Sequence, residues 1–232
     1  MEIEVQDDAD AVAAAGARFI AAAARKAVAA RGRFVVALSG GRTPWAMLRA
    51  LATLDLPWAG VQIVQVDERA APAGDAERNL THLRDSLLVR APLAAGQVHA
   101  MPVEVRDLDA GAALYAATLR EIAGTPPVLD LVHLGLGLDG HTASLLPGDP
   151  VLTIVDRDVA STAVDTKPRR MTLTLPLLNR SRQILWVVTG AGKVDMLRRL
   201  RGGDRSIPAG RIAGERAWIL ADRQAVALST TR

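Results

Sequence analysis

The chain has 232 residues, of which 50% are hydrophobic and 23% are charged, and its formal net charge is +3. This composition is typical of a soluble globular protein and excludes an intrinsically disordered chain. Cysteine is absent, which excludes disulfides, a thiol nucleophile and a thiolate metal site. Residues 91–103 form the longest charge-free run, which is too short to span a membrane, and the first residues are acidic where a secretory signal is basic. We therefore expect a single cytoplasmic domain over residues 1–232, without a membrane partner.

The sequence pI near 9.9 raises the question of nucleic-acid binding. The 28 Lys and Arg residues are interspersed with 25 Asp and Glu residues, and only 3% of the chain is aromatic. A nucleic-acid interface needs a basic stripe with stacking aromatic side chains, which this pattern lacks. We therefore expect no nucleic-acid partner.

Two hydrophobic periodicities alternate along the chain. Short apolar runs predict strands over residues 33–38, 61–66, 129–134, 171–175, 184–188 and 218–220. Helical patterns cover residues 8–30 and 109–122, and further helices are expected after a Thr43 cap with Pro44 at the first position, from an Asp75 cap through Leu88, and after Gly192. Strands separated by helices predict a doubly wound α/β fold, with a mainly parallel sheet and helices on both faces.

Ligands of such a sheet bind beyond the carboxyl ends of its strands, so the loops after Leu38, Val66 and Leu134 are the expected site. The first loop reads Ser39-Gly40-Gly41-Arg42-Thr43-Pro44. Its glycines permit a close approach of the backbone, Ser39 and Thr43 offer hydroxyls, and the next helix presents free N–H groups, which together suit a phosphate. The Gly-Lys-Ser/Thr ending of a P-loop is missing, and an ordinary glycine turn with a capping threonine is the alternative.

The second loop places three charged residues, Asp67-Glu68-Arg69, directly after an apolar strand, and Glu77-Arg78-Asn79 follows. The Arg69 guanidinium is a permanently charged fork that could hold a phosphate or polarise a carbonyl. The alternative is a solvated turn with local ion pairs.

The third loop, residues 135–148, contains the spacing G-x-G-x-x-G, which formally matches a dinucleotide-binding fingerprint. Such a fingerprint opens a full helix, whereas Pro147 and Gly148 would end any helix within two turns. We therefore expect no nicotinamide cofactor.

The same loop carries Asp139 and His141 at the end of a strand. An imidazole there can accept a proton near neutral pH, and a nearby carboxylate can fix its tautomer. The alternative is a hydrogen-bonded structural histidine. The four histidines lack the spacing of a metal site, and no Gly-x-Ser-x-Gly elbow occurs. We expect chemistry that is non-covalent and free of metals and cofactors.

Read together, these motifs closely resemble the 6-phosphogluconolactonase family. That family carries Ser-Gly-Gly-x-Thr-Pro, then Asp-Glu-Arg followed by Asn, and then Leu-Gly-x-Gly-x-Asp-Gly-His-Thr-Ala-Ser-Leu-Phe-Pro-Gly. The last signature matches residues 134–148 here, with Leu146 in place of Phe. Three later segments also resemble it: Lys167 to Pro176, Gly190 to Lys193, and Ile207 to Ala209. The matches keep the family's order over most of the chain.

The resemblance implies hydrolysis of 6-phospho-D-glucono-1,5-lactone, a sugar-phosphate substrate. His141 would be the general base on water, Asp139 would orient it, and Arg69 would stabilise oxyanion charge or hold the substrate. Arg170 is chosen over its neighbour Arg169 because it aligns with the family's arginine. The expected phosphate ligands are Ser39, Gly40, Gly41, Thr43, Arg170 and Lys193, and the further site candidates are Asp67, Glu68 and Asn79.

Glucosamine-6-phosphate deaminase, from the same superfamily, is the rival enzyme. Deaminases typically have Asp-Glu-Tyr where this chain has Arg69 as the third residue, and their segment after the histidine ends in Asn-Glu-Pro. Residues 142–147 here contain no Glu. A nicotinamide-dependent enzyme and a non-catalytic sugar-phosphate sensor are the remaining alternatives, and the sequence does not predict an oligomeric state.

Overall fold

The computed structural model describes residues 1–163 and 168–227. Over these residues the chain forms a seven-stranded sheet with the order β1-β10-β9-β6-β2-β3-β5, in which every neighbouring pair is parallel. The strands of this sheet are β1 (Glu2–Gln6), β2 (Phe34–Leu38), β3 (Val61–Gln65), β5 (Val98–His99), β6 (Leu131–Leu134), β9 (Ile184–Val188) and β10 (Ala217–Asp222).

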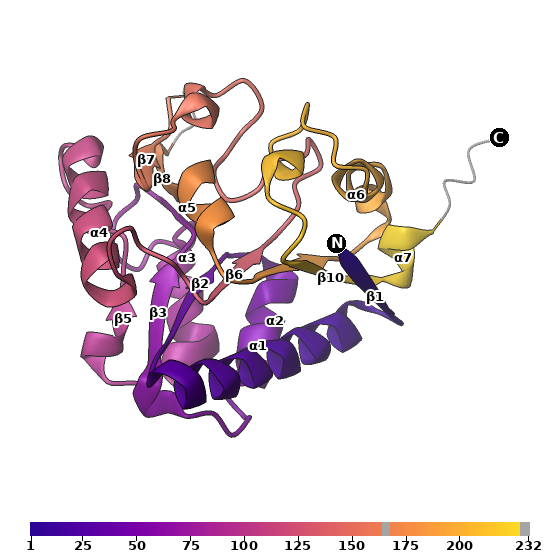
Figure 1. Ribbon diagram of the computed structural model, residues 1–232, viewed down its shortest axis with the longest axis horizontal. Helices are drawn as coiled ribbons and strands as arrows, with labels where there is room; N and C mark the ends of the chain where they lie inside the picture. The colour runs from indigo at the N-terminus through magenta and orange to yellow at the C-terminus, as the bar shows by residue number, and fades with distance from the viewer. Residues whose placement is uncertain (164–167, 228–232) are drawn as a thin grey trace.

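Helices cover both faces of this sheet (Figure 1). One face packs against α1 (Ala9–Arg31), α2 (Arg42–Leu51), α3 (Asn79–Leu83) and the π-helical segment Arg84–Leu88. The other face packs against α4 (Leu108–Ala123), α5 (Leu175–Arg180), α6 (Val194–Arg201) and α7 (Arg223–Val226). Short 3-10 turns lie at Trp58–Gly60, Ala95–Gln97, Pro150–Thr153, Ala191–Lys193 and Ala209–Arg211. The predicted doubly wound α/β fold is confirmed.

The central strands β2, β6 and β9 are buried on both faces, which explains why they are apolar apart from His133 of β6. Along β2, Phe34, Val36 and Leu38 belong to the core beneath α1 and α2, whereas Val35 and Ala37 belong to the core beneath α4. This alternation follows from the two-residue period of a strand. In the described part of the chain, no helix has the length and apolar character needed to cross a membrane.

A second sheet lies beside the first and corrects two predictions. It is antiparallel, with β4 (Asp67–Arg69) paired to β8 (Arg170–Leu173) and β8 paired to β7 (Val159–Ser161). Residues 67–69 were expected to be a loop and residues 171–175 a strand of the main sheet, but Leu175 already begins α5. Short strands of mixed polarity such as β4 carry little hydrophobic signal, so their pairing is set by tertiary contacts.

Other differences concern element starts. Gly41 precedes α2, so Thr43 is not its cap, and α3 begins after Arg78 rather than at an Asp75 cap. Asp75 instead accepts a hydrogen bond from the backbone of Glu77 in the preceding turn. Strand β1 was missed because it is a mostly exposed edge strand and lacks an apolar run.

The order of the strands places the site. From β2 the chain moves to β3 on one side, and it later returns to β6 on the other side of β2. A reversal of this kind opens a crevice at the carboxyl ends of the two central strands. Ser39 follows β2 there and Gly135 follows β6, so the first and third loops of the predicted site meet at this crevice.

Candidate active site

A cleft of about 550 Å³ opens at the carboxyl edge of the sheet. This volume is in the range of small-molecule sites. The described residues that line it are Ser39, Gly40, Gly41, Trp45, Asp67, Arg69, Asn79, Gly135, Leu136, Gly137, Leu138, Asp139, His141, Ala143, Arg170 and Lys193. The fold therefore brings most of the predicted site residues together, and two of them, Thr43 and Glu68, lie outside this lining.

His141 and Asp139 sit in the loop that follows β6. The Nδ1 atom of His141 lies 2.5 Å from Oδ1 of Asp139, and the backbone N–H of His141 donates to the same oxygen at 3.1 Å. Burial raises the pKa of Asp139, but these hydrogen bonds outweigh it, so the net pKa is lowered. A carboxylate can only accept, so His141 carries its proton on Nδ1 and leaves Nε2 as the basic nitrogen.

Gly137 makes room for this imidazole. A Cβ atom at residue 137 would lie 2.2 Å from Nδ1 of His141 and 2.7 Å from Oδ1 of Asp139. No side chain larger than hydrogen fits there without moving the pair. The glycine of this loop is therefore explained by close approach to the histidine.

Arg69 projects from β4 into the cleft and is held by Asn79. Its Nη1 donates to Oδ1 of Asn79 and to the backbone oxygen of Glu77, each at 2.9 Å. Asn79 in turn donates from Nδ2 to the backbone oxygen of Asp67 at 3.0 Å. Gly40 permits this arrangement, because a Cβ there would lie 2.1 Å from Oδ1 of Asn79.

Arg170 lies directly opposite Arg69 in the β4–β8 ladder. Residues that face each other in a ladder project from the same side, and like charges in this position are destabilising. The Nε atoms of both arginines are buried and lack a hydrogen-bond partner among the described residues. Burial, and then the charge of Arg69, lower the pKa of Arg170. Two facing guanidinium groups that both line the cleft make a site suited to an anion.

The structure separates the two candidate arginines of β8. Arg170 lines the cleft, whereas Nη2 of Arg169 donates to Oγ of Ser161 at 3.1 Å, outside the lining. Lys193 reaches the cleft from the 3-10 turn after β9. Burial lowers the pKa of Lys193, and the nearby carboxylate of Asp139 opposes this change.

The Ser39 loop, which follows β2, is hydrogen-bonded to the neighbouring strand β6. The hydroxyl of Ser39 donates to the backbone oxygen of His133 at 3.0 Å, and its backbone N–H donates to Nδ1 of His133 at 3.3 Å. Thr43 is not among the residues that line the cleft, and its hydroxyl lies 2.8 Å from that of Thr189. The loop therefore offers the cleft backbone atoms and the start of α2 more than hydroxyl groups.

Asp67 is a buried carboxylate in the wall of the cleft. Its Oδ2 accepts a hydrogen bond from the hydroxyl of Ser144 at 2.6 Å. Burial raises the pKa of Asp67, against the opposing effects of the Ser144 hydrogen bond and the charge of Arg69. Ser144 is not among the predicted site residues, although it belongs to the signature over residues 134–148 and could have been proposed from that position.

Sequence reasoning also missed apolar parts of the wall. Trp45 lies in the first turn of α2 and stacks on His82, with ring centroids 3.8 Å apart. Leu138 stands 68% exposed at the mouth of the cleft, and Ala143 has a positive φ of 52°. Positive φ is uncommon outside glycine and is often found at functional sites. Within the described residues, no group of three or more His, Asp or Glu side chains is arranged to hold a metal ion.

Comparison with known proteins agrees with the motifs. The family model of glucosamine-6-phosphate isomerases/6-phosphogluconolactonase matches residues 7–220. The chain is 38% identical over 240 residues to a 6-phosphogluconolactonase of Mycobacterium tuberculosis, with 97% of both chains covered. It is 38% identical over 203 residues to a 6-phosphogluconolactonase of Synechocystis, with 84% of both chains covered.

The fold agrees as well. A crystal structure of 6-phosphogluconolactonase from Thermotoga maritima has a TM-score of 0.83 and 26% identity to this chain, and covers 95% of this chain and 98% of that one. The range matched by the family model includes the loops after β2, β3 and β6 that line the cleft. The chain belongs to the glucosamine-6-phosphate isomerase/6-phosphogluconolactonase family.

Proposed function

We propose that this protein hydrolyses 6-phospho-D-glucono-1,5-lactone to 6-phospho-D-gluconate, a step of the oxidative pentose phosphate pathway. The observation that carries the proposal is one cleft in which the Asp139–His141 pair faces a cationic group made of Arg69, Arg170 and Lys193. The near full-length similarity to proteins named 6-phosphogluconolactonase supports the same reaction. Its partner is a free sugar phosphate, and we expect it to act in the cytoplasm.

His141 supplies the base in this mechanism. Its Nε2 removes a proton from a water molecule, whose oxygen attacks the carbonyl carbon C1 of the lactone. The resulting tetrahedral intermediate then breaks the bond between C1 and the ring oxygen, and the proton passes from His141 to that leaving oxygen. Asp139 keeps the imidazole in the reactive tautomer and stabilises its charged form, because its carboxylate lies against Nδ1.

The cationic groups divide the remaining work. Arg69 stabilises the negative charge that develops on the carbonyl oxygen or holds the substrate beside His141. Arg170 and Lys193 bind the phosphate together with the backbone of Ser39, Gly40 and Gly41 at the start of α2. Among the described residues that line the cleft, three are cationic and two, Asp67 and Asp139, carry carboxylates. The excess of positive charge suits a phosphate dianion.

Two alternatives fit the cleft less well. A deaminase of the same family would carry Tyr in place of Arg69 and a Glu after the histidine, and residues 142–147 contain none. A nicotinamide-binding fingerprint would open a helix, but residues 135–149 form turns and one isolated bridge.

The test is the rate of 6-phosphogluconate release from freshly generated lactone, corrected for spontaneous hydrolysis, for the wild type and His141→Ala. We expect rapid hydrolysis that falls by about 10²–10⁴-fold in the variant, the usual contribution of a general base. Acceleration that survives the substitution would overturn the role of His141. An inactive wild type would overturn the reaction itself, and ammonia release from glucosamine 6-phosphate would then test the deaminase alternative.

A further inference from the structure

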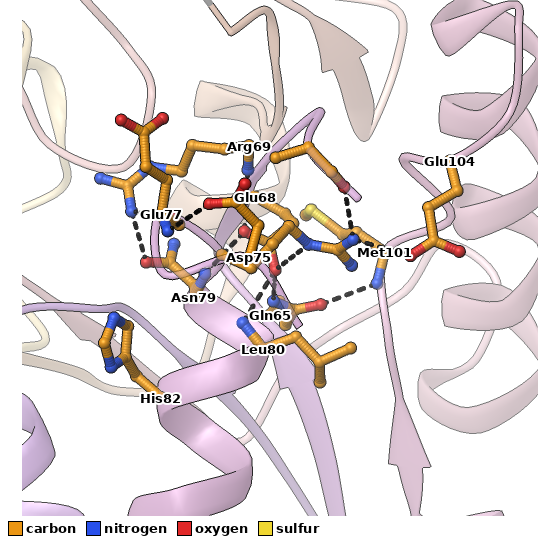
Figure 2. Close-up of polar contacts among 12 residues, drawn as sticks. Gln65, Glu68, Arg69, Asp75, Glu77, Asn79, Leu80, His82, Met101 and Glu104 are labelled. Atoms are coloured by element: carbon orange, nitrogen blue, oxygen red, sulfur yellow. Dashed lines mark hydrogen bonds and ion pairs between the residues drawn. The ribbon is translucent and has the colours of Figure 1, made fainter. Parts of the chain in front are cut away.

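Glu68 lies beneath the cleft and is completely buried. It is the middle residue of β4, so its side chain leaves the strand on the face opposite to Asp67 and Arg69, which line the cleft. Figure 2 shows its carboxylate within a polar network that includes Gln65, Asn79 and Leu80. A buried carboxylate that cannot touch the substrate needs another explanation.

Both oxygens of this carboxylate are fully used. Oε1 accepts the backbone N–H groups of Arg69 and Asn79, each at 2.8 Å. Oε2 accepts Nε2 of Gln65 and the backbone N–H of Leu80, each at 2.8 Å, and lies 3.1 Å from Nε of Arg78. Four of these contacts are hydrogen bonds donated to the oxygens, and the contact with Nε of Arg78 is an ion pair. A carboxylate, which carries a negative charge and no hydrogen of its own, satisfies all of them.

One oxygen therefore ties together the backbones of the two residues whose side chains meet in the cleft. Oε1 bridges the N–H groups of Arg69 and Asn79, and the side chains of the same two residues are joined by the 2.9 Å hydrogen bond from Nη1 to Oδ1. β4 and α3 are separated by a turn of nine residues, 70–78, that has no regular secondary structure to fix its span. The carboxylate of Glu68 fixes the distance between β4 and the start of α3, because it binds a backbone N–H of each.

The partners of Glu68 are themselves anchored. Arg78, whose side chain is 3% exposed, also donates to the backbone oxygen of Ala71 and to Oε1 of Glu104, each at 2.8 Å. Gln65 accepts the backbone N–H of Met101 at 2.8 Å. The network thus connects β3, β4 and α3 to the segment after β5, and it resists small shifts of any one of them.

We propose that Glu68 is a positioning residue, whose carboxylate sets the place of the Arg69 guanidinium in the cleft by holding the Arg69 and Asn79 backbones together. This inference deepens the proposed function and rests on it for its kinetic readout. Misplacement of a reacting or charge-stabilising group by about 1 Å can reduce the rate by about 10²-fold. The hydrogen bond between Arg69 and Asn79 is the contact through which the effect passes.

The first test is Glu68→Gln, an isosteric change that turns one oxygen into an NH₂ group facing N–H donors. We expect kcat/KM per folded molecule to fall by about 10- to 100-fold. The change should appear in kcat if Arg69→Gln changes kcat, and in KM if Arg69→Gln changes KM. Arg69→Gln should also cost less in the Glu68→Gln background than in the wild type, because both changes remove one arrangement. Unchanged kcat/KM, or fully additive costs, would overturn the proposal.

Asp130→Asn is the matched control for loss of stability. Asp130 is also a buried carboxylate, which accepts the backbone N–H of Val35 at 2.8 Å and pairs with Arg31 at 2.6 Å. It lies at the opposite edge of the sheet, just before β6, away from the residues that line the cleft. We expect both variants to lower the Tm and only Glu68→Gln to change kcat/KM.

A crystal structure of Glu68→Gln separates this inference from the proposed reaction. We expect the contact between Nη1 of Arg69 and Oδ1 of Asn79 to be lost, whereas its retention at 2.9 Å would overturn the positioning role. A wild type that does not hydrolyse the lactone would overturn the reaction and leave this structural readout intact.

Glu68→Asp covers the case in which Glu68→Gln does not fold. It keeps a negative charge beside Arg78 but is one methylene too short to bridge the N–H groups of Arg69 and Asn79. We therefore expect it to fold and to show the same kinetic defect as Glu68→Gln. Failure of both variants to fold would assign Glu68 to the stability of the fold and overturn the proposal.

Discussion

Nδ1 of His141 lies 2.5 Å from Oδ1 of Asp139, a residue only two positions earlier in the chain. Both residues therefore come from one glycine-rich turn. Gly137 packs against the pair so closely that no space remains for a side chain, and the turn thereby restricts the position of the His141 ring. The cationic groups reach this pair from other parts of the chain, because Arg69, Arg170 and Lys193 line the same cleft.

Replacement of Asp139 by Asn tests the carboxylate in this pair. The amide keeps the shape but removes the charge that stabilises the imidazolium, so we expect kcat to fall by about 10²-fold, less than for His141→Ala. Because the Asp139 side chain is 52% exposed, the Tm should change little. Initial rates on the lactone and a thermal melt check both statements, and wild-type kcat in this variant would contradict the assigned role.

The packing of Gly137 against the imidazole makes a second prediction. Gly137→Ala places a Cβ 2.2 Å from Nδ1 of His141, which must move, and we expect a loss of kcat close to that of His141→Ala. Gly135→Ala adds the same methyl group two residues earlier, where no atom lies within 4 Å. Steady-state rates of the two variants should differ strongly, and equal losses would count against the steric argument.

Arg170 and Lys193 are predicted to recognise the phosphate. Hydrogen bonds to charged groups are worth about 1.5–3 kcal/mol, so Arg170→Gln and Lys193→Gln should each lower kcat/KM for the phosphorylated lactone by about 10- to 100-fold. With unphosphorylated glucono-1,5-lactone the same changes should have little effect.

Arg169→Gln is the control for this pair of variants, because Arg169 bonds to Ser161 outside the cleft lining. It should leave the ratio of the two kcat/KM values as in the wild type. A drop of equal size on both lactones in the Arg170 or Lys193 variant would assign that residue to another task than phosphate binding.

His133 makes the stability depend on pH. Burial lowers its pKa from 6.5 to about 3, so between these values the unfolded chain binds a proton that the folded chain does not. The contribution of this group to the free energy of unfolding is complete above pH 6.5 and is lost as the pH falls toward 3. At pH 5 the loss is about 2 kcal/mol.

Urea unfolding at pH 7.5 and pH 5 checks this prediction, with His133→Asn as the comparison. The asparagine oxygen can still accept the N–H of Ser39, which Nδ1 of His133 accepts at 3.3 Å in the wild type. The wild type should lose more free energy of unfolding on acidification than the variant does. An equal loss in both proteins would show that His133 does not cause the pH dependence.

The central strands, the loops at their carboxyl ends and the closeness of Asp139 to His141 could be predicted from the sequence. Val35 and Ala37 lie in β2, which is apolar throughout because both faces of the sheet are covered, and this composition can be recognised without a structure. Parallel strands end at one edge, so the loops at Ser39 and Gly135 had to meet there. The contact between Asp139 and His141 is local in sequence, and residues that close together need no long-range information to become neighbours.

The charged residues that line the cleft depend on the pairing of strands that are distant in sequence. Arg69 and Arg170 are about a hundred positions apart, and the register of β4 and β8 makes them opposite neighbours while it directs Arg169 elsewhere. Glu68 and Thr43 are predicted site residues by their position in motifs, yet neither lines the cleft: Glu68 alternates with Asp67 and Arg69 along β4, and the hydroxyl of Thr43 bonds to that of Thr189. Pairing between distant short strands is selected by packing and burial across the whole molecule, which a local pattern of residues does not encode.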